Sequence, residues 1–552
     1  MSAETTTSTP TPLVNVQIDG AWHQFPKGTR IIEACSQVGK FIPRYCYHAR
    51  LSSPGNCRMC MVQLGMPKMG PDRKPELGPD GKPVHNWVPR TNISCAQDVS
   101  EGLSVRTDSD VVKEARKAVL EFLLINHPLD CPICDQAGEC RLQEFSVDYG
   151  QANGRFLEEK VKKPKHVEIG PRITYDAERC ILCTRCIRFM REVAKDDVIG
   201  IVNRGGENYI ACHPDRALDS NYSLNTVDLC PVGALTSTDF RFKMRTWFLK
   251  ETKSICTSCA TGCNTVISSR ENLVYRQTPR ENGDVNQAWM CDYGRLAFRD
   301  LASPERLLTP IVRGGDQPDW NTAFASIANA FKLVAPGQTA IIASGKQTNE
   351  ELFLAAQLIK ALGVTLHDIL PHTGEGDEIL LSTDRNPNTA GAKLLGVSAA
   401  TPGANLPAIA DGVRSGEIRA LIVLGEDAAE IGLSPFALKN LEVLLVLSTL
   451  PNATTAAATH VLPSAGFAEK RGSLINKTGR LQRLNAAVQA PGIARDDWEI
   501  LNALLGTLTE NAPGFATLED VFQAMAATTP ALAGLNFGKI GDLGVQLPTA
   551  SF

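Results

Sequence analysis

Hydrophobic and polar residues alternate near the start of the chain in the pattern of a β-hairpin. The segments 13–18 (LVNVQI) and 21–26 (AWHQFP) flank Asp19-Gly20, a dipeptide that favours a tight turn between antiparallel strands. The next segment, 29–39 (TRIIEACSQVG), has the apolar spacing of a short helix that ends at Gly39. We therefore expect two strands and a helix before the first cysteine-rich loop.

A second helix is expected between a capping region at Thr107–Ser109 and Asn126. Pro128 disfavours helical geometry in the residue before it, so the helix should end near Asn126 and deliver His127 at its end. Apolar residues recur at helical spacing through this segment, at Val111, Ala115, Val119, Phe122 and Leu123.

The last 250 residues alternate between apolar β-rich runs and helical patterns. The runs are 339–345 (TAIIASG), 419–425 (RALIVLG) and 441–451 (LEVLLVLSTLP), and residues 348–363 between the first two form a capped amphipathic pattern that ends at Gly363. Such alternation predicts a doubly wound α/β domain.

Composition narrows the class of protein. A chain of 552 residues exceeds one ordinary core, and 43% hydrophobic with 21% charged residues is typical of a soluble globular protein. A net charge of −4 gives no sign of a basic surface for nucleic acid. The sequence contains no run of 18 apolar residues that could span a bilayer. Residues 1–16 lack the regions of a secretory signal, and Glu4 without any arginine argues against a mitochondrial transit peptide. A mature cytoplasmic protein is expected.

Cysteine usage carries most of the chemical information. All seventeen cysteines lie at or before Cys291, and many are grouped in C-x₂-C units. An odd number of cysteines without a signal peptide argues against disulfides. Thiolates that stay reduced are better explained as ligands of soft metal centres, either zinc or iron–sulfur.

The first ligand set is Cys46, Cys57, Cys60 and Cys95, spaced C-x₁₀-C-x₂-C-x₃₄-C. Two strands, a helix and a cysteine loop follow each other in the order of a plant-type ferredoxin β-grasp domain, which binds a [2Fe–2S] cluster. A zinc ribbon is the alternative, but zinc ribbons favour two close cysteine pairs and only one is present.

The third set along the chain is Cys180, Cys183, Cys186 and the distant Cys230, which precedes Pro231. Bacterial ferredoxins use C-x₂-C-x₂-C-x₃-C-P, and their fourth cysteine ligates a second cluster. Met190 occupies that fourth position here, so one [4Fe–4S] cluster is expected, with zinc as the alternative. Arg185 and Arg188 flank Cys186 and are expected to donate to sulfur, to offset cluster charge, or to lie solvated at the surface.

The fourth set is Cys256, Cys259, Cys263 and Cys291, spaced C-x₂-C-x₃-C-x₂₇-C. Four thiolates suit zinc or [4Fe–4S], and spacing alone leaves both open. Cys35 and Cys212 remain outside the sets, and we expect them to act as small buried hydrophobes.

The second set lies in residues 127–140 (HPLDCPICDQAGEC) and is one cysteine short. Cys131, Cys134 and Cys140 need a fourth partner, and every other well-spaced cysteine belongs to another set. A histidine before a proline is ordinarily a loop residue. The ligand count nevertheless makes His127 the candidate fourth ligand of this site.

With these four sets in this order, the chain resembles the large 75-kDa-type iron–sulfur subunits of respiratory NADH:quinone oxidoreductases, complex I. The resemblance covers residues 12–305 and is weaker beyond them. The segments that carry it are 41–62 (FIPRYCYHARLSSPGNCRMCMV), 127–140, 179–189 (RCILCTRCIRF) and 228–235 (DLCPVGAL).

The resemblance implies a cofactor for each set. It implies [2Fe–2S] at the first set, [4Fe–4S] through His127 and three cysteines at the second, and [4Fe–4S] through four cysteines at the third. The fourth set is similar to the cubane site at the head of molybdopterin oxidoreductases, and it implies a third [4Fe–4S] cluster. Residues 459–480 (THVLPSAGFAEKRGSLINKTGR) resemble the part of that fold where a molybdenum cofactor lies. We expect no such cofactor, because the last 250 residues are short for a fold that encloses one and hold no cysteine to ligate the metal, although serine or aspartate can substitute for that cysteine.

The implied fold is multidomain α+β and α/β. The expected domains are a β-grasp [2Fe–2S] domain at 12–97, a His/Cys₃ [4Fe–4S] domain at 98–150 and a ferredoxin-like [4Fe–4S] domain at 170–248. A bis-pterin-type [4Fe–4S] domain at 249–305 and a degenerate molybdopterin-oxidoreductase-like α/β domain at 306–552 follow.

The implied function is an electron relay. Electrons from NADH would arrive through a partner flavin subunit, pass through these clusters and leave toward quinone, while the whole complex translocates protons. No catalytic residue and no site for NADH, flavin or quinone is expected on this chain, which lacks G-x-G-x-x-G and G-x₄-G-K-[ST] motifs.

The expected partners are the flavin/NADH-binding subunit and the other iron–sulfur and quinone-site subunits of the peripheral arm, with no nucleic acid. The expected location is peripheral, on the cytoplasmic side of a bacterial inner membrane, without insertion into lipid. Alternatives are an electron-transfer subunit of a soluble NAD-linked hydrogenase or formate dehydrogenase, and a zinc-stapled scaffold.

Overall fold

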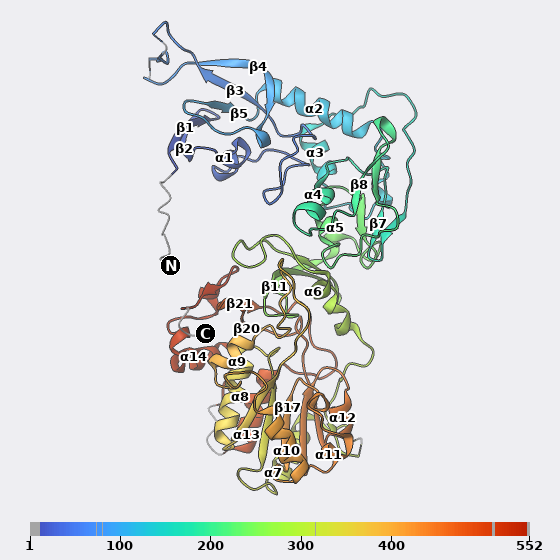
Figure 1. Cartoon of the computed structure of the whole chain (residues 1–552), viewed down its shortest axis with the longest axis vertical. Helices are drawn as coiled ribbons and strands as arrows, with labels where there is room; N and C mark the ends of the chain where they lie inside the picture. Colours follow the sequence, from blue (N-terminus) through green and yellow to red (C-terminus); the bar gives the residue numbers. More distant parts are fainter. Residues whose placement is uncertain (1–10, 73, 80, 315, 510–513, 549–552) are drawn as a thin grey trace, which may run out of the picture. The chain divides into compact units, whose positions relative to one another are not determined.

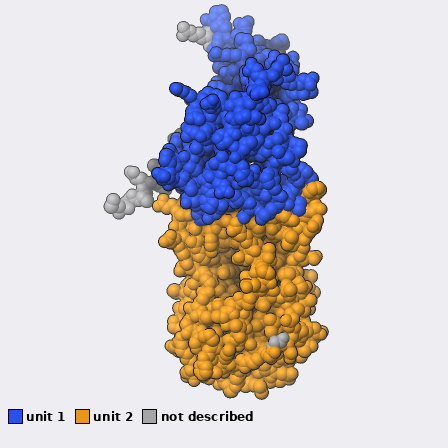
Figure 2. Space-filling view, turned by 90° about the vertical axis from the view of Figure 1, so that its right-hand side faces the viewer, with its two compact units in different colours: residues 1–247 blue, residues 248–552 orange. Residues whose placement is uncertain are grey.

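The computed structural model describes residues 11–72, 74–79, 81–314, 316–509 and 514–548. The contacts of the chain divide it into two compact units, Met1–Trp247 and Phe248–Phe552 (Figures 1 and 2). Each unit is described by itself. Residues 1–10, on which part of the expectation about targeting rests, lie outside the described residues.

Unit 1 (Met1–Trp247) opens with a five-stranded sheet in the order β2-β1-β5-β3-β4. The predicted hairpin is confirmed as β1 (Leu13–Ile18) paired antiparallel with β2 (Ala21–Pro26), and the predicted helix as α1 (Ile31–Gln37). Strand β5 (Ser104–Arg106) runs parallel to β1 and antiparallel to β3 (Met61–Pro67), which pairs with β4 (His85–Ile93). The helix buries Ile31, Ile32 and Cys35 against this sheet, as in a β-grasp fold.

The second predicted helix is confirmed as α2 (Asp110–Leu124), with Ser109 at its N-cap. The apolar residues that predicted it are not the ones it buries most deeply. Val112, Arg116 and Leu120 are buried, whereas Phe122 is 74% exposed. The buried face includes an arginine because Arg116 Nη2 donates to Met61 O at 2.9 Å.

The rest of unit 1 consists of short elements separated by long loops (Figure 1). A three-stranded sheet has the order β10-β7-β6, and β8 pairs with β9 in a separate ribbon. The elements are α3 (Arg141–Tyr149), β6 (Val167–Gly170), β7 (Ile173–Tyr175), α4 (Arg185–Glu192), β8 (Ile199–Val202), β9 (Tyr209–Cys212), α5 (Asn225–Leu229) and β10 (Leu235–Ser237).

Unit 2 (Phe248–Phe552) is built around a six-stranded sheet in the order β14-β19-β18-β17-β15-β16. All its pairings are parallel except that of the edge strand β14 with β19. The three predicted apolar runs are confirmed as β15, β17 and β18. The strands are β14 (Ile311–Val312), β15 (Thr339–Ser344), β16 (Leu366–Leu370), β17 (Ala420–Leu424), β18 (Val443–Ser448) and β19 (His460–Pro463).

Helices cover both faces of this sheet, which makes it the predicted doubly wound α/β domain. One core joins alternate strand residues such as Ile422 to α7 (Trp320–Phe331), α8 (Asn349–Ala361), α13 (Asp497–Leu508) and α14 (Leu518–Thr528). The other joins the intervening residues such as Leu421 to α10 (Leu406–Ser415), α11 (Pro435–Lys439) and α12 (Ala453–Ala457). Helix α8 begins with the capping box Thr348–Glu351, where the sequence predicted a capped helix.

Two smaller sheets complete unit 2. The first has the order β11-β12-β13, and the second has the order β20-β21-β22. Their strands are β11 (Lys250–Ile255), β12 (Asn264–Arg270), β13 (Leu273–Pro279), β20 (Gly472–Ile475), β21 (Arg480–Leu484) and β22 (Val545–Gln546), and the remaining helices are α6 (Asp292–Leu296), α9 (Thr389–Leu394) and α15 (Phe537–Ile540).

Candidate metal centres

The four cysteines of the first set come together at the end of the β-grasp sheet. Cys46, Cys57 and Cys60 lie in the loop before β3, and Cys95 lies in the turn after β4. Ser94 fastens the two segments, because its N–H and hydroxyl both donate to Cys60 O at 3.1 and 2.8 Å. Cys46, Cys60 and Cys95 are buried, and Cys57 is partly exposed.

Hydrogen bonds connect the cysteines of this first set. The backbone N–H of Cys46 donates to Cys57 Sγ at 3.5 Å. Hydrogen bonds from Cys57 and Cys95 lower the pKa of Cys46 to about 2, whereas their bonds to Cys46, together with burial, raise the pKa of Cys57 and of Cys95. Cysteines this close to one another can ligate a shared multi-atom cluster.

The second set surrounds the short loop between α2 and α3. Cys140 is the N-cap of α3, and Cys131 opens a single 3₁₀ turn. Arg245 holds this loop, since its guanidinium donates to Cys134 O at 2.5 Å and to Pro132 O at 2.6 Å. On the other side, Arg179 pairs with Asp130 at 2.6 Å.

His127 stands at the end of α2, where the sequence placed it. Burial lowers the pKa of its imidazole to about 4, so the ring is neutral near pH 7, which is the form that ligates metals. Among the described residues, no hydrogen bond or ion pair engages this ring. Its nitrogens are therefore available for ligation.

The third set lines a small pocket. Cys180, Cys183, Cys186 and Cys230 all contribute to its wall, together with apolar residues such as Val232 and Leu235. Burial raises the pKa of Cys180, Cys183 and Cys230 to about 11 and that of Cys186 well above its usual range. Ligation here must be coupled to loss of the thiol protons.

The fourth set is buried at the start of unit 2. A Cβ placed on Gly294 would lie 2.7 Å from Cys256 Sγ and 3.5 Å from Cys291 Sγ, so both sulfurs face one point that only glycine leaves open. Burial raises the pKa of Cys256 to about 12, that of Cys291 to about 11, and that of Cys263 well above its usual range.

Residues 459–480, which resemble a molybdenum-cofactor segment, pack against this fourth set. Asn476 Nδ2 donates to Thr261 O at 3.1 Å, and Lys477 N donates to Ala260 O at 2.7 Å. Lys470 forms a buried ion pair with Glu351 at 2.8 Å. In this structure the segment supports the Cys259–Cys263 loop.

Several ligand loops contain non-glycine residues in the left-handed region. Arg58, Leu182 and Thr184 have φ angles of 61°, 52° and 62° and lie between or beside ligand cysteines. Such conformations are uncommon for these residues and persist where surrounding contacts impose them. Leu182 N donates to Cys180 Sγ at 3.4 Å, so this backbone shape aims an N–H at a ligand sulfur.

The arrangement of the third set shows whether its residues fit a multi-atom cluster or a single metal ion. Within the described ranges, no group of three or more His, Cys, Asp or Glu side chains converges on a single metal ion. The four cysteines spread instead around the wall of one cavity. Four thiols around a shared space form the donor set of a [4Fe–4S] cluster, so the residues fit that group.

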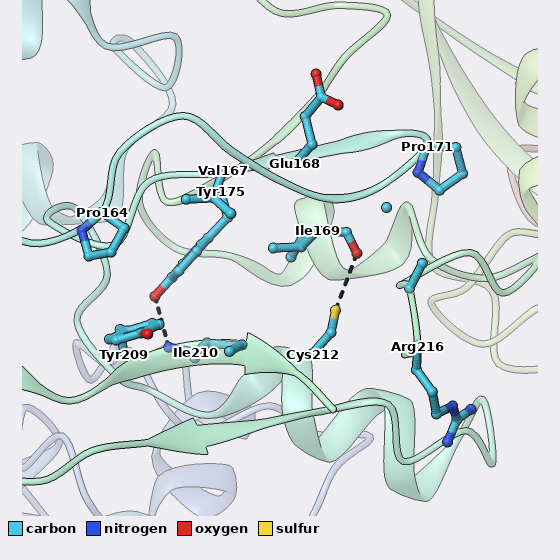
Figure 3. A pocket seen from close by; sticks show the side chains of 13 residues that line it. Pro164, Val167, Glu168, Ile169, Pro171, Tyr175, Tyr209, Ile210, Cys212 and Arg216 are labelled. Carbon is cyan, nitrogen blue, oxygen red and sulfur yellow. Dashed lines mark hydrogen bonds between the residues drawn. The ribbon is translucent and has the colours of Figure 1, made fainter. Parts of the chain in front are cut away.

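Tyr175 is a residue of this site that the sequence did not reveal. Figure 3 shows its hydroxyl accepting a hydrogen bond from Ile210 N–H, at 3.1 Å. A hydrogen bond with Tyr175 opposes the rise that burial causes in the pKa of Cys180. Tyr175 and Ile210 line both the cysteine cavity and a surface pocket of about 450 Å³, so they form the partition between them. A tyrosine five residues before a cysteine gives no sequence signal of this contact.

The two cysteines outside the sets have different environments. Cys35 is completely buried on the inner face of α1, as expected, and burial raises its pKa to about 12. Cys212 is only partly buried on the wall of the surface pocket, where its thiol donates to Ile169 O at 3.2 Å (Figure 3).

The part of the chain that the structure describes contains no helix long and apolar enough to cross a membrane.

Family models match the chain in the order of the four ligand sets. They are a 2Fe-2S iron–sulfur cluster binding domain (residues 11–110), the NADH-ubiquinone oxidoreductase-G iron–sulfur binding region (116–155), the ferredoxin-like domain of NADH-quinone oxidoreductase subunit 3 (170–236) and an NDSU1/NuoG-like 4Fe-4S domain (249–299). A molybdopterin oxidoreductase model matches 383–507. The chain is thus an iron–sulfur protein with [2Fe–2S]- and [4Fe–4S]-binding domains ahead of a molybdopterin-oxidoreductase-type domain, which confirms the predicted fold class.

Named relatives show what the chain is similar to. The mitochondrial 78 kDa subunit of NADH-ubiquinone oxidoreductase of Candida albicans is 40% identical over 356 residues, which cover 63% of this chain and 46% of the relative. The mitochondrial NADH dehydrogenase [ubiquinone] iron-sulfur protein 1 of Solanum tuberosum is 39% identical over 358 residues (64% and 45%), and NADH-quinone oxidoreductase subunit 3 of Thermus thermophilus is 37% identical over 366 residues (63% and 46%). The chain is similar to these subunits of NADH dehydrogenases, as its motifs predicted. It spans about half the length of the curated relatives it matches.

A chain of an NAD⁺-reducing [NiFe]-hydrogenase structure also matches, at 24% identity and a TM-score of 0.35, covering 42% of this chain and 91% of that chain.

Proposed function

We propose that this chain is the iron–sulfur electron relay of an NADH:quinone oxidoreductase. It would receive electrons derived from NADH through a flavin-binding partner subunit and pass them toward the quinone-site subunits of a proton-translocating complex. Those partners, and a peripheral position on the cytoplasmic side of a bacterial inner membrane, are part of the proposal. The homology to the iron–sulfur subunits of NADH-quinone oxidoreductases supports it.

We further propose one [2Fe–2S] cluster at the first set and a [4Fe–4S] cluster at each of the other three, with no molybdenum cofactor. The proposed domains keep the expected ranges 12–97, 98–150, 170–248, 249–305 and 306–552. When bound, each cluster would supply a one-electron carrier. The chain's own residues hold the ligands, exclude water and set the spacing between sites.

One observation carries the proposal: the ligand loops of unit 1 are packed against one another. The segment Cys230–Gly233 joins the second and third sets. Pro231 O accepts a hydrogen bond from Arg141 N at 3.1 Å, directly after Cys140. A Cβ on Gly233 would stand 2.3 Å from Cys134 Sγ, so glycine permits this approach. Since tunnelling falls steeply with distance, contiguous sites of this kind suit a relay.

Metal analysis of the purified full chain tests the proposal. One binuclear and three tetranuclear clusters require about 14 iron atoms and as much acid-labile sulfide per chain, with distinct EPR signals after reduction. Stoichiometric zinc without paramagnetism would overturn it. Co-purification with membrane subunits of a proton-translocating complex distinguishes this function from that of a soluble hydrogenase or formate dehydrogenase subunit.

The ligand role of His127 has its own test. His127→Ala should remove or weaken the EPR signal of the second site and leave the other signals unchanged. His166→Ala is the matched control, because His166 is an exposed histidine of the same unit whose ring contacts Arg241. An unchanged spectrum in His127→Ala would show that His127 is only a loop residue.

A further inference from the structure

Helix α4 carries two arginines, the buried Arg188 and the partly buried Arg185, that contact the loops of both the first and the third ligand set. Arg188 is only 8% exposed, and its guanidinium donates to Cys46 O at 2.5 Å and to Ser52 O. It also donates to Thr184 Oγ1 at 3.2 Å and to Cys183 O at 3.5 Å. One side chain therefore touches both ligand loops, across 142 positions of sequence.

Arg185, one turn earlier on the same helix, makes a second bridge. Its Nη2 donates to Tyr47 O at 2.6 Å, beside Cys46, and its Nη1 donates to Leu229 O at 3.3 Å, beside Cys230. Its Nε is buried without a hydrogen-bond partner. Together the two arginines fasten the loop 46–52 to the loops that carry the third set.

These two positive charges have no counter-ion among the protein groups described. Neither guanidinium forms an ion pair with a carboxylate in the part of the chain that the structure describes, and every acceptor above is a neutral oxygen. Burying unpaired charges is costly unless an opposite charge compensates. Arg185 lies within electrostatic reach of Cys46, Cys57 and Cys183, which belong to the first and third sets.

Iron–sulfur clusters with four thiolate ligands supply such a charge. A [2Fe–2S] or [4Fe–4S] core bound by four thiolates is anionic in both oxidation states and gains one further negative charge on reduction. A fixed cation nearby stabilises the reduced state more than the oxidised one, and local charge is one of the ways in which a protein sets a cluster's potential.

We propose that Arg185 and Arg188 are the shared counter-charge of the first and third cluster sites, and that they raise the reduction potential of both while fixing the distance between them. This inference rests on the proposed function, since it requires clusters at both sets. It assigns the two arginines as positioning and potential-setting residues, through contacts to backbone carbonyls and not to sulfur.

An EPR-monitored redox titration of the full chain with its clusters tests this assignment. Arg188→Gln and Arg185→Gln remove one positive charge each, so the midpoint potentials of the binuclear centre and of the Cys180 site should both shift downward. The His127 site should shift less. Cys60→Ser and Cys183→Ser, each expected to lose one signal, assign the signals beforehand.

Two further variants separate charge from structure. Arg191→Gln is the matched control, because Arg191 lies on the same helix, is exposed and pairs with Asp197 at the surface. It should leave both potentials unchanged. Arg188→Lys keeps the charge and loses the planar fork, so it should preserve both potentials more closely than Arg188→Gln while loosening the contact between the loops.

The outcomes distinguish the inference from the proposed function. Absence of iron–sulfur signals in the unaltered chain would overturn the proposed function. Signals of normal intensity with unshifted potentials in both glutamine variants, or an equal shift in Arg191→Gln, would overturn the inference alone. If Arg188→Gln does not retain its clusters, Arg185→Gln and Arg188→Lys decide by the same potentials.

Discussion

The two units of this chain bury different kinds of residue. In unit 2 the central sheet is covered on both faces, and every residue of Ala420–Leu424 is completely buried among aliphatic side chains. In unit 1 the residues 38–60 and 150–166 form neither helix nor strand. Around its ligand sets the buried residues include cysteines, Asp176, Arg179 and Arg188.

This difference shows two sources of order. Unit 2 has the apolar burial that stabilises an ordinary doubly wound domain. Long irregular loops are uncommon in compact domains unless they serve a function. The loops of unit 1 are arranged around thiols and guanidiniums, so their order should depend on the clusters that those groups bind.

Removing iron should have the largest effect, because it should destabilise the ligand loops of unit 1 and leave the central sheet of unit 2 intact. Chains produced without iron should lose amide protection in 40–60, 127–140 and 180–186, because structural metal sites can contribute about 10 kcal/mol or more to folding. The strands β15, β17 and β18 should keep their protection. Hydrogen exchange with mass spectrometry of the iron-free and iron-loaded chains measures this, and equal losses in both units would contradict it.

A core substitution should act on unit 2 alone. Ile422→Ala deletes buried methyl groups at the centre of β17 and should lower the free energy of unfolding of unit 2 by about 2–5 kcal/mol. The EPR signals of the first three sites should not change. Leu333→Ala, at a 74% exposed leucine of the same unit, is the control and should change stability by less than about 0.5 kcal/mol.

A buried carboxyl group should give unit 2 a distinct pH dependence. Burial raises the pKa of Glu350 from 4.5 to about 7, against the hydrogen bonds that it accepts from Ser473 at 2.6 and 2.8 Å. The stability that protonated Glu350 contributes is fully present below pH 4.5, its pKa in the unfolded chain. This stability is lost as the pH rises through 7, its pKa in the folded chain. Between these limits the original protein should lose about 3 kcal/mol of its free energy of unfolding, and Glu350→Gln should not show this loss. Thermal unfolding of both proteins across pH 5–8 measures the difference. Parallel pH curves for the two proteins would contradict this.

Two equally buried cysteines of unit 1 give the smallest and sharpest contrast. Cys35 and Cys60 are 0% and 1% exposed, and only Cys60 belongs to a ligand set. Cys35→Ala should cost about 1 kcal/mol through packing and leave the iron content unchanged. Cys60→Ala should lose the binuclear signal. Loss of that signal in Cys35→Ala would show that the ligand assignment is wrong.

Local sequence patterns predicted much of the fold. Alternation around Asp19-Gly20 predicted the hairpin β1–β2, and the capped pattern at Thr348 predicted α8, because turns, caps and periodicity act between residues a few positions apart. The close C-x₂-C pairs predicted the centres of the ligand sets for the same reason. The helix α2 was predicted, but not its buried face, which includes Arg116 because Met61 O lies opposite it.

The chain sequence by itself determined which side chains could be ligands and which segments become helices and strands. The tertiary structure alone decided which sites are neighbours. Arg185 and Arg188 could have been surface residues, yet they join loops more than 130 positions apart through backbone carbonyls, which every residue carries. Tyr175 and Gly233 likewise owe their roles to the ligand cysteines that folding places beside them, Cys180 and Cys134. Contacts of this kind leave no pattern in sequence, since they depend on proximity and not on the identity of the acceptor residue.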